Sequence, residues 1–255
     1  MIQNVTIIGA GNVAAHLGKS LFESGYNILE IVGRTPEKVT DLATRFSANG
    51  IINIYKINTS SQLYIIAVND DSIDDVCKSM PLVDGIVVHT SGSTGFESLK
   101  RFKKYGVLYP FQTLTKDKAI NFKEVQLLIE GSDAEVTHLL KQVGSDLSSK
   151  VMTTTYDQRK QLHIAAIFAS NFVNHFYSIA NAFLKEKNLS FELLLPLIDE
   201  TTEKIKHIEP HLAQTGPASR GDQTVIQKHI EALKDNPDYK LIYELLSKSI
   251  QKGIF

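Results

Sequence analysis

Residues 1–14 read MIQNVTIIGAGNVA, an apolar run followed by a glycine-rich turn and the start of a helical pattern. Glycine at Gly9 lets the backbone reverse without a clash from Cβ, and glycine at Gly11 lets a phosphate approach the main chain. Free N–H groups at the start of the next helix, together with the helix dipole, favour a bound anion. The context of strand, turn and helix predicts a dinucleotide-binding turn. Its expected binding residues are Gly9, Gly11, Asn12 and Val13.

The composition excludes several classes of protein. The 255 residues include 27 Lys and Arg against 28 Asp and Glu, so the charge gives no support for binding nucleic acid or an anionic membrane. The one cysteine, Cys77, cannot form an intramolecular disulfide, and no apolar run reaches the length of a membrane span. The histidines are scattered, without the spacing of metal ligands, so no metal is expected. With no basic leader before the first strand, a cytoplasmic protein is expected.

The N-terminal half alternates apolar strands with helical patterns. We expect helices near residues 12–24, 36–49, 71–80 and 133–147, and a further crossover at 95–102. Strands are expected near 28–32, 51–55, 63–68, 86–89, 106–109, 125–129 and 151–153. The run LYIIAV, residues 63–68, is typical of a parallel strand buried on both faces. The alternation predicts an α/β fold with a Rossmann-type, doubly wound, mostly parallel sheet.

Strand signals stop after residue 154. Residues 156–187 contain no glycine or proline and carry apolar residues at helical spacing, which predicts one long helix. Further helices are expected at 191–207, 223–233 and 238–251, separated by breaks that contain proline or glycine. The sequence therefore predicts a dinucleotide-binding domain over residues 1–154 and an all-helical domain over residues 155–255.

The end of the second strand indicates which dinucleotide is bound. An NAD enzyme places an acid there for the ribose 2′-hydroxyl, but Gly33-Arg34-Thr35 offers a guanidinium and a hydroxyl that suit a 2′-phosphate. Glu30 lies near the expected spacing, yet Ile31 and Val32 after it keep it inside the strand. NADP is favoured over NAD, with Arg34, Thr35 and Lys38 as binding residues.

Polar residues follow three other strands, at the edge of the sheet where ligands of open α/β folds bind. The fourth strand ends at Val68 and Asn69, and Thr90 and Ser91 follow the fifth; all four are predicted to bind the cofactor. His89 is either a packing histidine or a site residue. We expect Pro110 to end the sixth strand, and Thr113 after it is a candidate catalytic residue.

Several motifs resemble those of bacterial NADP oxidoreductases of unknown substrate, which join a Rossmann domain to an uncharacterised helical domain. The motifs are GRT, AVNDDSI, HTSGS and YPFQT in the first half, and HIAAIFASNFVNH and TGPASRGD in the second. The resemblance covers nearly the whole chain. More remotely, the N-terminal half is similar to pyrroline-5-carboxylate reductases and deazaflavin-dependent NADP reductases. These relatives imply the fold, an NADP cofactor and a helical dimerisation domain, but no substrate.

The long helix carries a stripe of uncharged polar residues when residues are counted at 100° each. His163 and Asn171 belong to its first half. The stripe is either a polar seam inside the helical core or dimer interface, or one wall of a substrate cleft. His163 is the candidate proton donor, and Asn171 would orient the substrate.

The sequence thus predicts an NADP-dependent oxidoreductase that transfers hydride between NADP(H) and a small carbonyl or imine. The helical domain is expected to complete the site and to form a homodimer. Two alternatives remain open: a non-catalytic dimer that binds or senses NADP, and hydride exchange with a deazaflavin.

Overall fold

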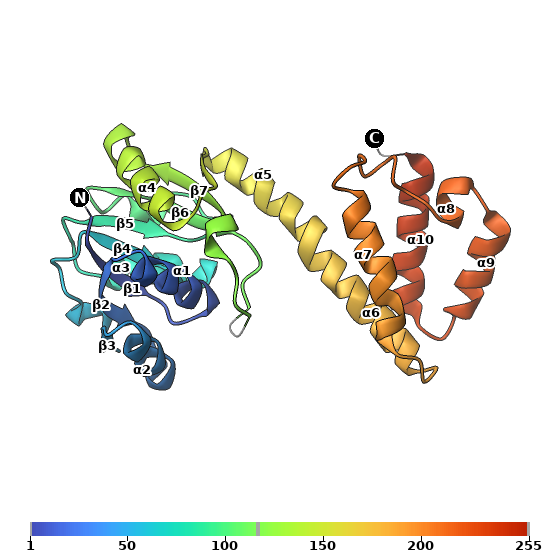
Figure 1. Ribbon diagram of the computed structural model, residues 1–255, viewed down its shortest axis with the longest axis horizontal. Helices are drawn as coiled ribbons and strands as arrows, with labels where there is room; N and C mark the ends of the chain where they lie inside the picture. The colour runs from blue at the N-terminus through green and yellow to red at the C-terminus, as the bar shows by residue number, and fades with distance from the viewer. Residues whose placement is uncertain (1, 116–117, 254–255) are drawn as a thin grey trace. The chain divides into compact units, whose positions relative to one another are not determined.

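The computed structural model describes residues 2–115 and 118–253, and the chain divides into two compact units, residues 1–170 and 171–255. Within the described part of the first unit, eight strands form one sheet, and the second unit consists of helices (Figure 1). The strands end at Thr153, next to the boundary expected at residue 154, whereas the two compact units divide inside the helix that follows.

The sheet has the strand order β3-β2-β1-β4-β5-β6-β7-β8. The strands are Asn4–Ile8 (β1), Asn27–Val32 (β2), Asn49–Ile51 (β3), Leu63–Ile66 (β4), Ile86–His89 (β5), Tyr105–Phe111 (β6), Gln126–Gly131 (β7) and Val151–Thr153 (β8). Every neighbouring pair is parallel except β6 and β7. The first six strands have the Rossmann order, which confirms the predicted doubly wound, mostly parallel sheet.

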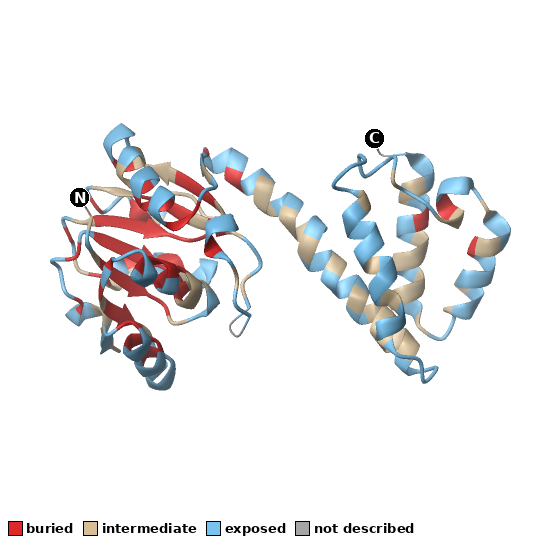
Figure 2. Cartoon of the chain, in the orientation of Figure 1, coloured by how far each residue is buried: buried red, intermediate tan, exposed pale blue. Residues whose placement is uncertain are grey.

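Helices cover both faces of this sheet. They are Asn12–Glu23 (α1), Pro36–Arg45 (α2), Ile73–Ser79 (α3) and Ala134–Leu147 (α4). Residues of α1, α2 and α4 pack into one hydrophobic core, and α3 packs into a second core on the other face. In β4, Leu63 and Ile65 face the first core while Tyr64 and Ile66 face the second, so burial on both faces explains the unbroken apolar run. Figure 2 shows the buried residues concentrated in the sheet.

Two expected elements differ from the structure. β3 spans Asn49–Ile51, before the predicted position, and residues Ile54–Lys56 form a 3₁₀ turn. The side chain of Asn53 accepts a hydrogen bond from the N–H of Tyr55, which favours a turn over a strand. Between β5 and β6 the crossover contains only the 3₁₀ turn Glu97–Leu99.

Pro110 lies inside β6, so the prediction that it ends the strand was wrong. The pairing of β6 with β5 stops at Val107, and beyond that point β6 pairs only with β7. Pro110 is therefore at an edge on the β5 side, where its missing N–H removes no ladder hydrogen bond.

One continuous helix runs from Tyr156 to Lys185, as predicted. It consists of Tyr156–Ala166 (α5), a π-helical stretch over Ile167–Phe172, and Val173–Lys185 (α6). Thr155 and Gln158 close its start with a reciprocal capping box. A π-helical turn holds more residues than an α-helical one, so the polar stripe counted at a uniform 100° per residue does not continue unchanged through residues 167–172.

The second unit has very little buried surface. Besides α6 it contains Leu195–Lys204 (α7), Pro217–Arg220 (α8), Gln223–Ala232 (α9) and Pro237–Lys252 (α10). Among its described residues only Ala218, Ile226 and Ser247 are buried. Asp222 caps α9, accepting a hydrogen bond from the N–H of Val225. In the ranges 2–115 and 118–253, no helix combines the length and apolarity that crossing a membrane requires.

Candidate functional site

The glycine turn between β1 and α1 is tightly constrained at its first glycine and open at its second. Gly9 has φ +126°, and a Cβ there would lie 2.1 Å from the carbonyl oxygen of Ala67. Gly11 has φ −95°, and a Cβ there would meet nothing within 4 Å. The fold thus explains glycine at Gly9 but not at Gly11. An open space beside Gly11 is what a phosphate would need to reach the main chain.

A cleft of about 420 Å³ lies beside this turn. It opens where the strand order reverses between β1 and β4, the position at which open α/β sheets bind their ligands. The cleft brings together more than half of the residues predicted to bind the cofactor. These are Gly9, Gly11, Arg34, Thr35, Lys38, Val68 and Asn69.

At the β2 end of the cleft, basic side chains are exposed and the acidic one is buried. Arg34 and Lys38 are exposed and line the cleft. Glu30 is only 6% exposed, and its carboxylate accepts a hydrogen bond from the N–H of Asn58 at 2.8 Å. Burial raises the pKa of Glu30. The acid is therefore held inside the sheet, while a guanidinium lies at its edge.

Asn12 and Val13, which are also predicted to bind the cofactor, belong to the first turn of α1. Asn12 donates from its side-chain amide to the carbonyl of Leu114 at 3.0 Å. One turn later, Nε2 of His16 donates to the carbonyl of Thr115 at 2.9 Å. Val13 is half-buried and packs against the core. The start of α1 thus holds the segment that follows β6.

The loop after β5 is held by the ring of His89, which is fully buried. Its Nδ1 accepts from the N–H of Ser91 at 3.1 Å, and its Nε2 lies 3.2 Å from the carbonyl oxygen of Gly95. Burial lowers the pKa of His89 to about 4, and the positive charge of the nearby Arg159 contributes to this shift. A neutral ring with Nε2–H satisfies both contacts. His89 is a packing histidine that shapes the loop.

The hydroxyl groups of the loop after β5 make hydrogen bonds inside the loop and to its neighbours. Ser91 accepts from the N–H groups of Ser93 and Thr94 and donates to the hydroxyl of Thr94. Thr90 is buried against the carbonyl of Ile66. Ser93 donates to the carboxylate of Asp70, which links the loops after β4 and β5.

Arg159 fastens the start of α5 to this loop. It is completely buried, pairs with Glu130 of β7 and donates from Nη2 to the carbonyl of Thr94 at 2.7 Å. Tyr156 adds a hydrogen bond from its hydroxyl to the carbonyl of Ser93. Because the guanidinium has no exposure to water, removing one partner would leave a buried charge unpaired. The first turns of α5 are therefore fixed on the first unit.

One turn beyond Arg159, His163 meets a residue that the sequence reasoning missed. Its Nδ1 lies 3.1 Å from the hydroxyl oxygen of Tyr109 in β6. Both side chains are half-buried, and a Cβ on Gly92 would lie 2.6 Å from His163 Nδ1 and 2.8 Å from Tyr109 Cε1. The sequence signal for this contact is the tyrosine of the segment YPFQT, which lies near the end of β6.

The other two predicted catalytic residues are Thr113 and Asn171. Thr113 is exposed, and both its N–H and its hydroxyl donate to the side chain of Gln112. Asn171 is exposed and belongs to the second compact unit. Among the described residues, no group of three His, Cys, Asp or Glu side chains is arranged to hold a metal ion.

Comparison with known proteins assigns both parts of the chain. Residues 4–92 match the family described as "NADP oxidoreductase coenzyme F420-dependent", and residues 125–250 match "Domain of unknown function (DUF2520)". A crystal structure described as a "putative NADP oxidoreductase" from Bacteroides fragilis is 38% identical, with a TM-score of 0.91 over 98% of each chain. The chain belongs to this NADP oxidoreductase family.

The family shares its fold with more distant reductases. An imine reductase from Myxococcus stipitatus, solved in complex with NADP+, is 14% identical, with a TM-score of 0.65 over 98% of this chain and 94% of that one. A 1-pyrroline-5-carboxylate reductase from Streptococcus pyogenes is 10% identical, with a TM-score of 0.61 over 98% of each chain. At these identities the likeness shows the fold alone. No curated protein matches this NADP oxidoreductase chain significantly.

Substituting the two glycines of the turn should change stability by very different amounts. Gly9→Ala would place Cβ against the carbonyl of Ala67 at a strained φ, so we expect it to lower the free energy of unfolding by about 3 kcal/mol or more. Gly11→Ala meets no protein atom and should change it by less than about 1 kcal/mol. Urea unfolding of both variants checks this, and equal losses would contradict it.

Because the His89 ring is buried in its neutral form, the folded protein should lose stability in acid. The pKa of about 4 lies below that of an unfolded histidine, so the unfolded chain takes up its proton first as the pH falls. Stability from His89 is present above about pH 6.5, and about 2 kcal/mol of it should be lost between about pH 7 and pH 5. Unfolding of wild type and His89→Asn over this range checks it, with exposed His138→Asn as the control. An equal loss in the wild type and His89→Asn would refute the assignment.

Proposed function

We propose that the protein is an oxidoreductase that transfers hydride between NADP(H) and a small carbonyl or imine substrate. The observation that carries this proposal is the cleft at the switch point, which combines open space beside Gly11 with the exposed guanidinium of Arg34. A plain structural turn needs neither feature.

The residues of the cleft fit an NADP cofactor. The N–H groups at the start of α1 and the open side of Gly11 suit a pyrophosphate. Arg34 and Lys38 suit a 2′-phosphate, and Thr35, whose side chain makes no capping bond to α2, has a hydroxyl to add. Val68, Asn69, Thr90 and Ser91 are proposed to border the nicotinamide end, with Asn12 and Val13 in the first turn of α1 beside the pyrophosphate.

Bound NADPH would supply the hydride. The chain's own part is to hold the substrate and to provide a proton or a hydrogen bond at the atom where charge develops. His163 is proposed for that role, because its ring nitrogen pairs with Tyr109 on a part of α5 that Arg159 fixes. Thr113 and Asn171 stay predictions for orienting the substrate.

The names of two proteins that share this fold make an imine the first acceptor to test. The Myxococcus protein is an imine reductase in complex with NADP+, and the Streptococcus protein is a 1-pyrroline-5-carboxylate reductase. The description of the family matched by residues 4–92 supports a second candidate, hydride exchange between NADP(H) and a deazaflavin.

Purified protein should be offered NADPH with separate panels of cyclic imines, small carbonyls and an oxidised deazaflavin. Loss of NADPH absorbance with an imine or carbonyl supports the proposal, and loss with the deazaflavin alone supports the second candidate. Tight NADPH binding without turnover would mean a binding or sensing protein. Gly11→Ala is the control, because it should keep the fold and weaken NADPH binding.

Cofactor choice is tested at Arg34. Arg34→Ala should weaken NADPH binding by about 1.5–3 kcal/mol, because a charge-assisted hydrogen bond to the 2′-phosphate is lost, and should leave NADH binding nearly unchanged. Titration calorimetry measures both. Arg45→Ala, which removes an exposed arginine at the far end of α2, is the matched control. A wild type that prefers NADH would refute the assignment.

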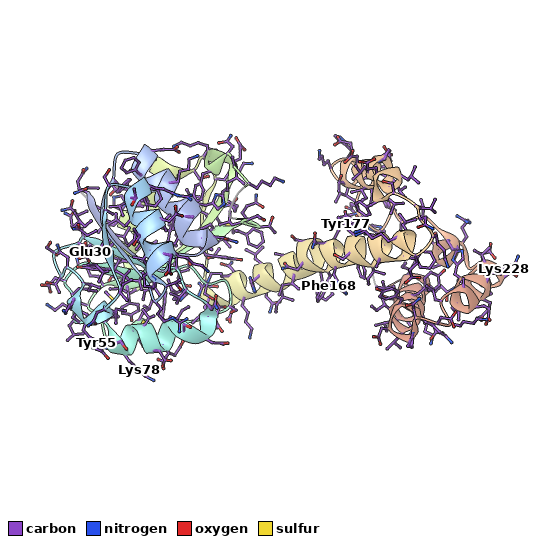
Figure 3. The ribbon with its side chains drawn as sticks, turned by 90° about the horizontal axis from the view of Figure 1, so that it is seen from below. Glu30, Tyr55, Lys78, Phe168, Tyr177 and Lys228 are labelled. Atoms are coloured by element: carbon purple, nitrogen blue, oxygen red, sulfur yellow. The ribbon has the colours of Figure 1, made fainter. Side chains whose placement is uncertain are left out.

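A homodimer through the helical unit is also part of the proposal. The unit exposes large apolar side chains while burying almost none, which is the pattern of a surface covered by a partner. Just before this unit begins, the long helix also exposes Phe168, which is 65% exposed and which Figure 3 shows projecting from the helix. Other exposed side chains are Phe172, Phe176, Leu193, Leu197, Leu241 and Leu245.

Sedimentation at micromolar concentration should give twice the chain mass of 28.4 kDa. An interface of this kind typically buries about 2,000 Å² or more. Phe176→Glu should weaken the dimer, whereas Phe22→Glu, at a similarly exposed phenylalanine on α1, should not. A wild type that sediments as a monomer would reject the dimer.

A further inference from the structure

The contact between Tyr109 and His163 joins two segments that are far apart in the chain. The hydroxyl oxygen of Tyr109 lies 3.1 Å from Nδ1 of His163, and the two ring planes meet at 63°. In the described part of the chain, Nε2 of His163 has no hydrogen-bond partner. One ring nitrogen is thus occupied and the other remains available to a ligand.

The direction of this hydrogen bond follows from the surroundings of the phenol. Burial raises the pKa of Tyr109, and the carboxylate of Asp70 raises it further, against an opposite effect of Arg159. The phenol therefore keeps its proton near neutral pH and can donate it to Nδ1. A neutral imidazole whose Nδ1 accepts must carry its hydrogen on Nε2.

The contact is also held in place by its neighbours. Gly92 packs so closely that a side chain there would clash with both rings. Arg159, four residues before His163, ties the same helix to Glu130 and to the carbonyl of Thr94. Tyr109 itself lies in β6, paired with Leu128 of β7. Strand, loop and helix all fix the pair.

We propose that Tyr109 is a positioning residue for His163: its hydroxyl holds Nδ1 and so presents Nε2–H as the group that donates to the substrate. This inference rests on the proposed function. A histidine whose second nitrogen is bound by a partner has a defined tautomer and orientation, which a donor in hydride transfer requires.

The proton and electron balance is complete with NADPH as the reductant. The hydride brings two electrons to the carbon of the C=O or C=N bond, and the π pair of that bond moves to the oxygen or nitrogen. That atom takes the proton from Nε2 of His163 while Nδ1 takes the proton of Tyr109. Once the product has left, Nδ1 returns this proton to the phenolate and Nε2 takes a new proton from water, which restores the starting tautomer. The products are NADP+ and an alcohol or amine.

The first test does not need turnover. Nitrogen-15 NMR of histidine-labelled protein should show His163 with hydrogen on Nε2 and with Nδ1 as a hydrogen-bonded acceptor. Tyr109→Phe should move the Nδ1 resonance towards that of an unbonded nitrogen. Tyr105→Phe, on the same strand but outside the pair, should leave it unchanged. Hydrogen on Nδ1 in the wild type would overturn the proposal.

The second test uses kinetics with an accepted substrate. Tyr109→Phe should lower kcat by roughly tenfold to a hundredfold with NADPH affinity unchanged, because the orientation of His163 and the proton that Tyr109 passes to Nδ1 are both lost. His163→Gln should lower kcat by roughly a hundredfold or more. The double variant should be no slower than His163→Gln, because Tyr109 acts through His163. Tyr105→Phe should keep wild-type kcat.

The outcomes separate this inference from the proposed function. If Tyr109→Phe costs more than His163→Gln, Tyr109 is itself the donor and the positioning role is wrong. If the two reductions in kcat add in the double variant, Tyr109 does not act through His163 and has only a structural role. If the wild type reduces no imine or carbonyl, the proposed function fails and the catalytic role falls with it, while the NMR result still reports whether Tyr109 sets the tautomer.

Discussion

The close approach of β1 to the end of β4 is the constraint on which the candidate site depends. The carbonyl of Ala67 occupies the space that any side chain on Gly9 would need, so the backbone turns there directly from strand to helix. This turn leaves the start of α1 open at Gly11 and places it beside the ends of β2 and β4. The cleft, its guanidinium and its helix N-terminus follow from that one backbone contact.

Features set by local sequence were predictable from the chain alone. The glycine turn and the buried run of β4 each depend on residues close together, so pattern and propensity were enough to identify them. The position of Arg34 also followed from its neighbours, because the apolar residues before it keep Glu30 inside the strand. The fold class could therefore be predicted from local signals.

The cluster around His163 was only half predictable, because its contacts join distant segments. His163 was recognised as a polar residue on an apolar helix, but no local pattern links it to Tyr109, and none links Arg159 to Glu130. Pro110 was misjudged because its tolerance depends on where β5 stops pairing. The π-helical stretch leaves no spacing signature, so counting residues at 100° could not reveal it.

The buried Arg159 has a consequence for the order of folding. Its partners lie 29 and 65 residues earlier in the chain, in β7 and in the loop after β5. A guanidinium cannot leave water before those partners are in place, because an unpaired charge in the interior is too costly. The start of the long helix should therefore dock late, after the sheet has closed, and such long-range closure is typical of slow steps in folding. The candidate donor site would then be the last part of the first unit to assemble.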